Sequence, residues 1–139
     1  MTPFSKLIVL FTVLLSAACS PTDHNSHESN SDIELNNGKK WIVVPEMFAY
    51  ITSIEDDINE FEGKTLVDHQ QLSTQISTTL GKLTSNCTMT GKGHDELHKW
   101  LLPFLDMADE YKNSSSTENA SKVLSEMKES YTVLHSNFE

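Results

Sequence analysis

The stretch PEMFAYITSIEDDINEF, from Pro45 to Phe61, carries a periodicity that recurs along the rest of the chain. Its large apolar residues alternate at intervals of four and three, which is the spacing of one face of an α-helix. These residues are Met47, Ile51, Ile54, Ile58 and Phe61. Proline is well suited to the first turn of a helix, where an N–H would have no partner. The stretch therefore predicts an amphipathic helix that begins at Pro45.

Three further stripes with helical periodicity follow along the chain. The second stripe consists of Leu72, Ile76, Leu80 and Leu83, after a capping pair at Thr65 and Asp68. The third stripe consists of His94, Leu97, His98, Leu101, Leu105 and Ala108. The fourth stripe consists of Val123, Met127, Tyr131, Leu134 and Phe138, and it starts after Ser115 and Glu118. Pro103 interrupts the third stripe and predicts a kink. No hairpin signal or internal repeat is visible. Four such helices with short connections predict an all-α, up-down-up-down four-helix bundle over residues 41–139.

The first residues, MTPFSKLIVLFTVLLSAACS (Met1 to Ser20), predict a secretory leader. A single basic residue precedes an apolar run that is too short to span a bilayer, and small residues lead up to Cys19. This arrangement resembles the lipobox of bacterial lipoproteins, although Ser16 stands where leucine is usual. The resemblance implies that residues 1–18 are a signal peptide, that Cys19 is lipidated, and that the protein is anchored in the outer membrane, facing the periplasm.

Residues 19–40 form a polar segment between this cysteine and the first helix. After Cys19 the segment reads SPTDHNSHESNSDIELNNGKK, which is rich in Ser, Asn and acids and has few large apolar side chains. Such a composition predicts a disordered tether. We interpret His24 and His27, which lie within it, as solvated side chains and not as a site.

The chain is acidic, with a formal net charge of −10, and removal of Lys6 with the leader makes the mature form more negative. Nucleic acid is therefore excluded as a partner, since phosphate binding needs a basic face. No nucleophile with a base and an orienting acid is recognisable, so we expect no enzymatic activity.

The stretch SNCTMTGKGHDELHKWLLP (Ser85 to Pro103) contains the residues with the most distinctive chemistry. If Cys19 is lipidated, Cys87 has no partner in a compartment where cysteines are usually paired. The glycines at 91 and 93 predict a flexible connection that leaves Cys87 and Met89 in a loop. His94 and His98 are one helical turn apart on the apolar stripe, so both rings are expected to face inward.

Helix order predicts which of these side chains meet. In an alternating bundle, the starts of the first and third helices and the ends of the second and fourth lie at one end. That end gathers Met47, Cys87, Met89, His94, His98 and His135. His69, at the start of the second helix, belongs to the opposite end.

Thiolate, thioether and two imidazoles form the ligand set that suits copper, so Cys87, Met89, His94 and His98 are the predicted metal ligands, and Met47 and His135 are additional candidates. Zinc would accept the cysteine and the histidines but gain little from methionine. A b-type haem between Met47 and His135 is a further alternative, although no C-x-x-C-H motif is present. The HDELH sequence differs from the H-E-x-x-H zinc-protease motif, because Asp95 holds the second position and Glu96 points elsewhere on the helix.

From Leu35 to Pro103, the segments LNNGKKW and NCTMTGKGHDELHKWLLP resemble a family of small, mostly uncharacterised bacterial lipoproteins. Members carry Cys-Thr-Met followed by His-Asp-x-Leu-His. The resemblance implies a helical bundle with a metal-binding role, and it carries over to Cys87, Met89, His94 and His98 only.

These observations together predict a periplasm-facing lipoprotein that binds one copper ion for copper handling or electron transfer. Its expected contacts are the membrane, through the lipid, and a copper-handling or redox protein. A structural or interaction lipoprotein without metal is the alternative from a different class.

Overall fold

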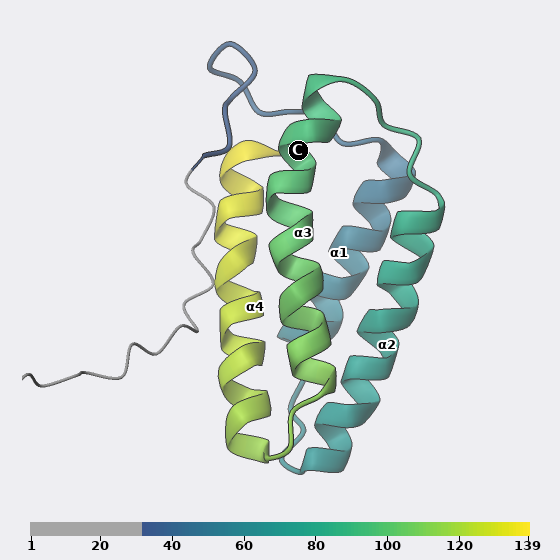
Figure 1. Cartoon of the computed structure of the whole chain (residues 1–139), viewed down its shortest axis with the longest axis vertical. Helices are drawn as coiled ribbons and strands as arrows, with labels where there is room; N and C mark the ends of the chain where they lie inside the picture. Colours follow the sequence, from purple (N-terminus) through teal and green to yellow (C-terminus); the bar gives the residue numbers. More distant parts are fainter. Residues whose placement is uncertain (1–31) are drawn as a thin grey trace, which may run out of the picture.

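The computed structural model describes residues 32–139. The predicted signal peptide, the predicted lipidation site at Cys19 and most of the predicted tether lie outside the described residues. Within them, four helices are present: α1 (Pro45–Asn59), α2 (Leu66–Ser85), α3 (Lys92–Lys112) and α4 (Thr117–Asn137). Figure 1 shows that they alternate in direction, so the starts of α1 and α3 lie at the same end as the ends of α2 and α4.

The predicted all-α four-helix bundle is confirmed. Helices that are adjacent in the chain pack against one another, and α4 also contacts α1 and α2. The stripe residues of α1 that lie within the helix are all buried, as are those predicted for α2 and α4. Phe61 is the exception in the first stripe, because α1 ends at Asn59 and its ring lies beyond the helix, 4.8 Å from that of His69 between centroids.

The starts of two helices follow from local capping. The Thr65 hydroxyl accepts the Asp68 N–H and the Asp68 carboxylate accepts the Thr65 N–H, so the predicted capping box is present. The predicted start of α4 is wrong by one residue. Ser116, not Ser115, is the N-cap and accepts the Asn119 N–H at 3.1 Å, which is the register that buries Ala120.

The buried face of α3 is rotated relative to the predicted stripe. The helix continues through Pro103 and buries two aromatic residues, Trp100 and Phe104, whereas Leu105 is only half-buried. His94 and His98 are also half-buried. The expectation that both imidazoles face fully inward is therefore wrong: the large aromatic rings fill the interior, and the histidines lie at the edge of the buried face.

Residues 32–41, here called the strap, cross the end of the bundle before α1 begins. Within the strap, Asn37 and Gly38 both have positive φ, and Asn36 and Lys39 exchange backbone hydrogen bonds of 2.8 and 3.1 Å. This is the geometry of a two-residue hairpin turn, for which Asn-Gly is a favoured sequence. This turn lies within the segment predicted to be a disordered tether.

The strap then joins the end of α4. The Trp41 N–H donates to the Asn137 carbonyl at 2.8 Å, and the Glu139 N–H donates to the Trp41 carbonyl at 2.9 Å. The part of the predicted tether that the structure describes is thus attached to the bundle. No helix within residues 32–139 is both long enough and apolar enough to cross a bilayer.

Candidate metal centre

His94 and His98 are the two predicted ligands that the structure brings into contact. They lie in the first two turns of α3, and their ring centroids are 4.1 Å apart with the planes inclined at 60°. The four-residue spacing places both imidazoles on one side of the helix. Neither ring has a hydrogen-bond partner among residues 32–139, so their ring nitrogens are available to a ligand as far as the described part of the chain is concerned.

The two sulfur residues occupy the connection between α2 and α3. The Asn86 N–H closes the end of α2 on the Lys82 carbonyl, and α3 begins after Gly91, which has a φ of 74°. Between these two points, Cys87 and Met89 are half-buried and pack against the hydrophobic core. Cys87 is a free thiol. The loop assignment of both residues is therefore as predicted.

The two additional candidates have different surroundings. Met47 is buried in the core of the bundle. His135 is on the surface, where its Nε2 lies 2.8 Å from a carboxylate oxygen of Glu55, in the second half of α1. The His135 ring is thus already paired with a carboxylate of α1, and its partner on that helix is Glu55, not Met47.

No group of three or more His, Cys, Asp or Glu side chains that could hold a metal ion is present in the described part of the chain. Methionine, whose thioether can also bind a soft metal, is not among these four residue types. Cys87, His94 and His98 are residues of these types, so the structure does not place the three together as a ready-made site.

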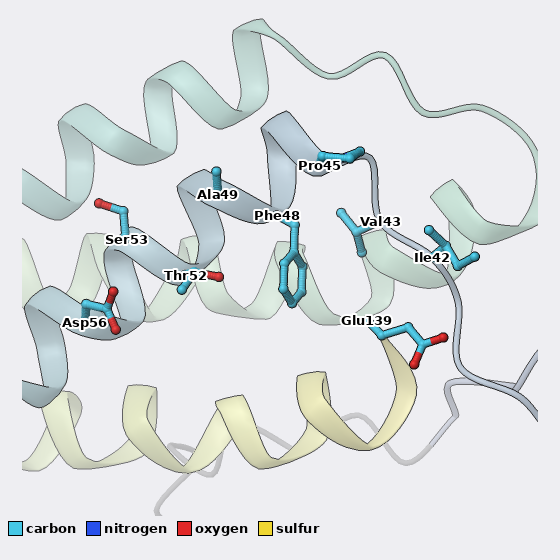
Figure 2. A pocket seen from close by; sticks show the side chains of 9 residues that line it. All are labelled: Ile42, Val43, Pro45, Phe48, Ala49, Thr52, Ser53, Asp56 and Glu139. Atoms are coloured by element: carbon cyan, nitrogen blue, oxygen red, sulfur yellow. The ribbon is translucent and has the colours of Figure 1, made fainter.

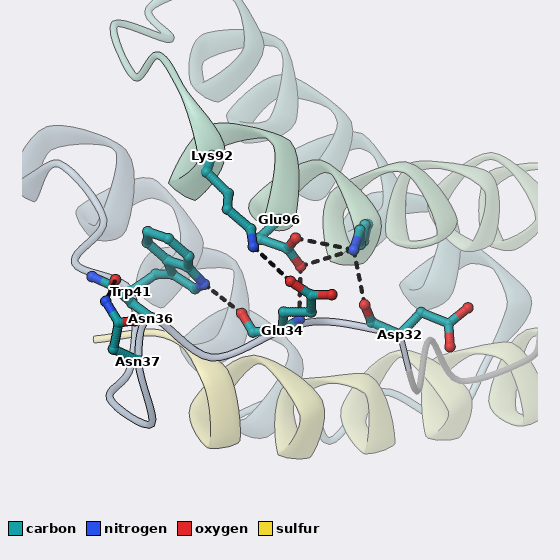
Figure 3. Close-up of polar contacts among 8 residues, drawn as sticks. Asp32, Glu34, Asn36, Asn37, Trp41, Lys92 and Glu96 are labelled. Atoms are coloured by element: carbon teal, nitrogen blue, oxygen red, sulfur yellow. Dashed lines mark hydrogen bonds and ion pairs between the residues drawn. The ribbon is translucent and has the colours of Figure 1, made fainter.

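Glu96, between the two histidines, has a structural role that the sequence did not reveal. Its side chain is buried, with 3% of the residue exposed, and one carboxylate oxygen accepts the Glu34 N–H at 2.8 Å. The Lys99 ammonium lies 3.0 Å from the same carboxylate and donates to the Asp32 carbonyl at 2.8 Å. Figure 3 shows this network between α3 and the strap. Glu96 thus attaches the strap to the helix of the histidine pair.

One further contact fixes the strap on the first turn of α3: Lys92 and Glu34 form an ion pair at 2.6 Å. Within the strap, the Trp41 indole N–H donates to the Glu34 carbonyl at 2.6 Å (Figure 3). A Cβ at position 93 would lie only 3.0 Å from the Trp41 ring. Gly93, predicted as part of a flexible connection, therefore lies inside α3 and allows the indole to approach the helix closely.

The electrostatics of this network favour its ionised form. Burial opposes ionisation of Glu96, but the Glu34 N–H and the Lys99 ammonium outweigh it and lower the pKa of Glu96 below its ordinary value of 4.5. The Lys92 ammonium lowers the pKa of Glu34, and Glu34 in turn raises the pKa of Lys92. At neutral pH both carboxylates are therefore charged.

Replacing Glu96 by Ala should release the strap from α3. The change removes the acceptor for the Glu34 N–H and the partner of Lys99, so we expect the free energy of unfolding to fall by about 1–3 kcal/mol. Hydrogen exchange of the Glu34 amide, followed by NMR, should become faster. Asp95→Ala, at the neighbouring exposed position, is the control and should leave that amide protected. Unchanged protection in Glu96→Ala would contradict the assignment.

The same carboxylate gives the strap a defined pH dependence. Because the pKa of Glu96 is lowered in the folded state, the contribution of this carboxylate to stability is present above about pH 4.5. The contribution is lost as the pH falls through the folded-state pKa. The stability difference between the wild type and Glu96→Gln should therefore be largest at neutral pH and shrink below pH 4.5.

A second polar cluster lies at the opposite end of the bundle, around the histidine that helix order excludes from the candidate centre. The His69 Nδ1 lies 2.8 Å from the Tyr111 hydroxyl, and its Nε2 lies 3.4 Å from the Ser121 hydroxyl. These partners are on α3 and α4. His69 therefore links three helices as a hydrogen-bonded core residue.

No protein-family model, curated protein or solved structure matches this chain.

Proposed function

We propose that the protein is a periplasm-facing lipoprotein that binds one copper ion for copper handling. His94 and His98 would supply the nitrogen ligands, and Met89 and Cys87 the sulfur ligands. The observation that carries the proposal is the contact between the two half-buried imidazoles, 4.1 Å apart between ring centroids, with no hydrogen-bond partner for either among residues 32–139. Two adjacent imidazoles without such partners are suited to sharing a cation.

The position of the sulfur residues favours copper handling over electron transfer. An electron-transfer site needs a rigid set of ligands that changes little between oxidation states. Here the sulfur residues lie on a connection whose backbone, from 87 to 90, makes no hydrogen bond to the described part of the chain. Because such hydrogen bonds do not hold the backbone of this loop, the loop can adjust as an ion binds or leaves, which suits capture and release.

Copper also fits the described donors better than a b-type haem. Haem ligation by Met47 and His135 would require His135, which lies on the surface, to leave Glu55 and turn into the bundle. Copper bound by the α3 pair does not require this change. The soft thioether of Met89 favours copper over zinc, and Cu(I) over Cu(II).

The test is an anaerobic Cu(I) titration of the purified full chain against a competing chelator. We expect one ion per chain. We expect His94→Ala and His98→Ala each to weaken binding by about 100-fold or more, since loss of a group that only hydrogen-bonds to a ligand already costs about 10–100-fold. His135→Ala, which removes a histidine from the same end, is the matched control and should bind normally. Wild-type affinity in both α3 variants would contradict the proposal.

The sulfur ligands are tested by two further variants. Met89→Leu keeps the packing volume and removes the thioether, so it should weaken Cu(I) binding without unfolding the bundle. Cys87 should react with a thiol reagent more slowly in the copper-loaded protein than in the metal-free protein, because a ligated thiolate is protected. Equal labelling rates would remove Cys87 from the ligand set.

A further inference from the structure

An open groove lies beside the start of α1, where the strap and the end of α4 meet the helix. Its volume is about 620 Å³, which is within the range of ligand-binding pockets. Figure 2 shows Phe48 and Val43 between Asp56 at one end and Ile42 and Glu139 at the other. The groove belongs to the same end of the bundle as the histidine pair, but none of its lining residues is a candidate metal ligand.

The apolar part of this groove is exposed for a structural reason. The Trp41 and Val43 N–H groups donate at 2.8 Å to the carbonyls of Asn137 and Glu139, so the backbone around Ile42 is held against α4. Side chains alternate along such an extended segment. Val43 is buried, and Ile42 is therefore directed outward with 76% of its surface exposed. Beside it, Phe48 is only partly covered.

The polar part of the groove is acidic. Asp56 is exposed one turn beyond Thr52, and Glu139 is exposed on the other side of the apolar residues. Neither carboxylate has an ion-pair partner among residues 32–139, whereas the adjacent Glu55 is engaged by His135. With a net charge of −10 for the chain, the surroundings attract cationic ligands and repel anionic ones.

We propose that this groove binds a basic amphipathic helix of a partner protein. Apolar side chains of that helix would cover Ile42 and Phe48, and its Lys or Arg side chains would pair with Asp56 and Glu139. This is the helix-in-groove mode of recognition, in which an apolar stripe provides contact area and flanking charges set the orientation.

Charge and composition disfavour two occupants that the predicted mature chain could itself provide. Residues 20–31 read SPTDHNSHESNS and contain no Lys or Arg and no large apolar residue, so they match neither part of the groove. A second copy would bring a net charge of −10 against the same acidic ends. The inference does not depend on metal binding.

The test measures binding of a fluorescein-labelled synthetic peptide to the full chain by fluorescence anisotropy. The peptide carries Leu at positions i, i+3, i+4 and i+7 and Lys at the others, which is the pattern of an amphipathic helix. Ile42→Asp and Asp56→Lys should each weaken binding by about tenfold or more. The matched controls are Leu102→Asp and Asp109→Lys, both at exposed positions of α3. They make the same chemical changes away from the groove and should alter the affinity by less than about twofold. Raising the salt concentration should weaken binding further.

Three results would overturn the proposal: no saturable binding to the wild type, equal loss of binding in the control variants, or equal binding of a Leu/Glu helix of the same pattern. Sedimentation of the wild type and of Ile42→Asp tests whether a second copy of the chain occupies the groove. A wild type that is dimeric and an Ile42→Asp variant that is monomeric would assign the groove to self-association. Circular dichroism of each variant confirms that the helices are intact.

Discussion

Replacing Phe104 by Ala should lower the free energy of unfolding by about 3–5 kcal/mol. The Phe104 side chain is fully buried in α3, with 0% of the residue exposed. Its ring stacks on that of Trp100 at 4.9 Å and meets that of Tyr131 edge-on at 5.4 Å, both between centroids. The substitution would therefore remove apolar contacts and leave a cavity in the middle of the bundle.

The effect should be large because this aromatic cluster joins three helices. The Tyr131 hydroxyl, on α4, donates to the Ile51 carbonyl of α1 at 3.2 Å, and the Trp100 indole N–H donates to the Ser130 carbonyl at 3.0 Å. A cavity at Phe104 would loosen both hydrogen-bonded rings, which cannot easily move to fill it.

Urea unfolding followed by far-UV circular dichroism measures the effect. Leu102→Ala, on the same helix at a residue that is 54% exposed, is the control and should change the free energy by less than about 0.5 kcal/mol. Leu105→Ala tests the orientation of α3, because Leu105 is only half-buried. A greater loss in Leu105→Ala than in Phe104→Ala would mean that α3 presents the stripe that sequence spacing predicted.

The second large effect is expected at His69, where acid should destabilise the bundle. Burial lowers the pKa of the His69 imidazole below its ordinary value of 6.5, although the neighbouring Asp68 carboxylate acts in the opposite direction. The unfolded chain therefore binds a proton at a higher pH than the folded chain does. The stabilisation is complete above pH 6.5 and is lost as the pH falls toward the folded-state pKa.

His69→Gln should remove this pH dependence and should also lower stability at neutral pH by about 1–3 kcal/mol, because the hydrogen bonds to Tyr111 and Ser121 are disturbed. The measurement is the free energy of unfolding between about pH 5 and pH 8. The wild type should lose up to about 1.4 kcal/mol per pH unit from this one group. His135→Gln, at the exposed histidine, should retain the His69 contribution. An equally steep profile in His69→Gln would show that another group is responsible.

Short-range patterns gave a reliable account of the helices. Apolar spacing predicted all four, and the Thr65–Asp68 pair predicted the start of α2, because helical periodicity and capping depend on residues three or four positions apart. The contact between His94 and His98 follows from the same spacing. The tight turn at Asn37 and Gly38 is also encoded locally, by an Asn-Gly pair.

Features that join distant parts of the chain could not be read in this way. Glu96 accepts the N–H of Glu34, a residue 62 positions earlier, and nothing in the sequence near Glu96 indicates that partner. The pairing of His135 with Glu55 is equally long-range, with 80 positions between them. Both contacts depend on how the helices rotate and on where the strap crosses them.

The rotation of α3 shows the physical reason most directly. Leu97 and Leu101 are buried in either orientation, but local spacing continues equally well to Leu105 or to Phe104. The choice depends on volume: the ring of Phe104 fills the space between Trp100 and Tyr131, and a leucine side chain is too small to make the same contacts. Because Tyr131 comes from α4, that preference exists only once the helices are packed together, and it is this packing that leaves His94 and His98 at the edge of the buried face.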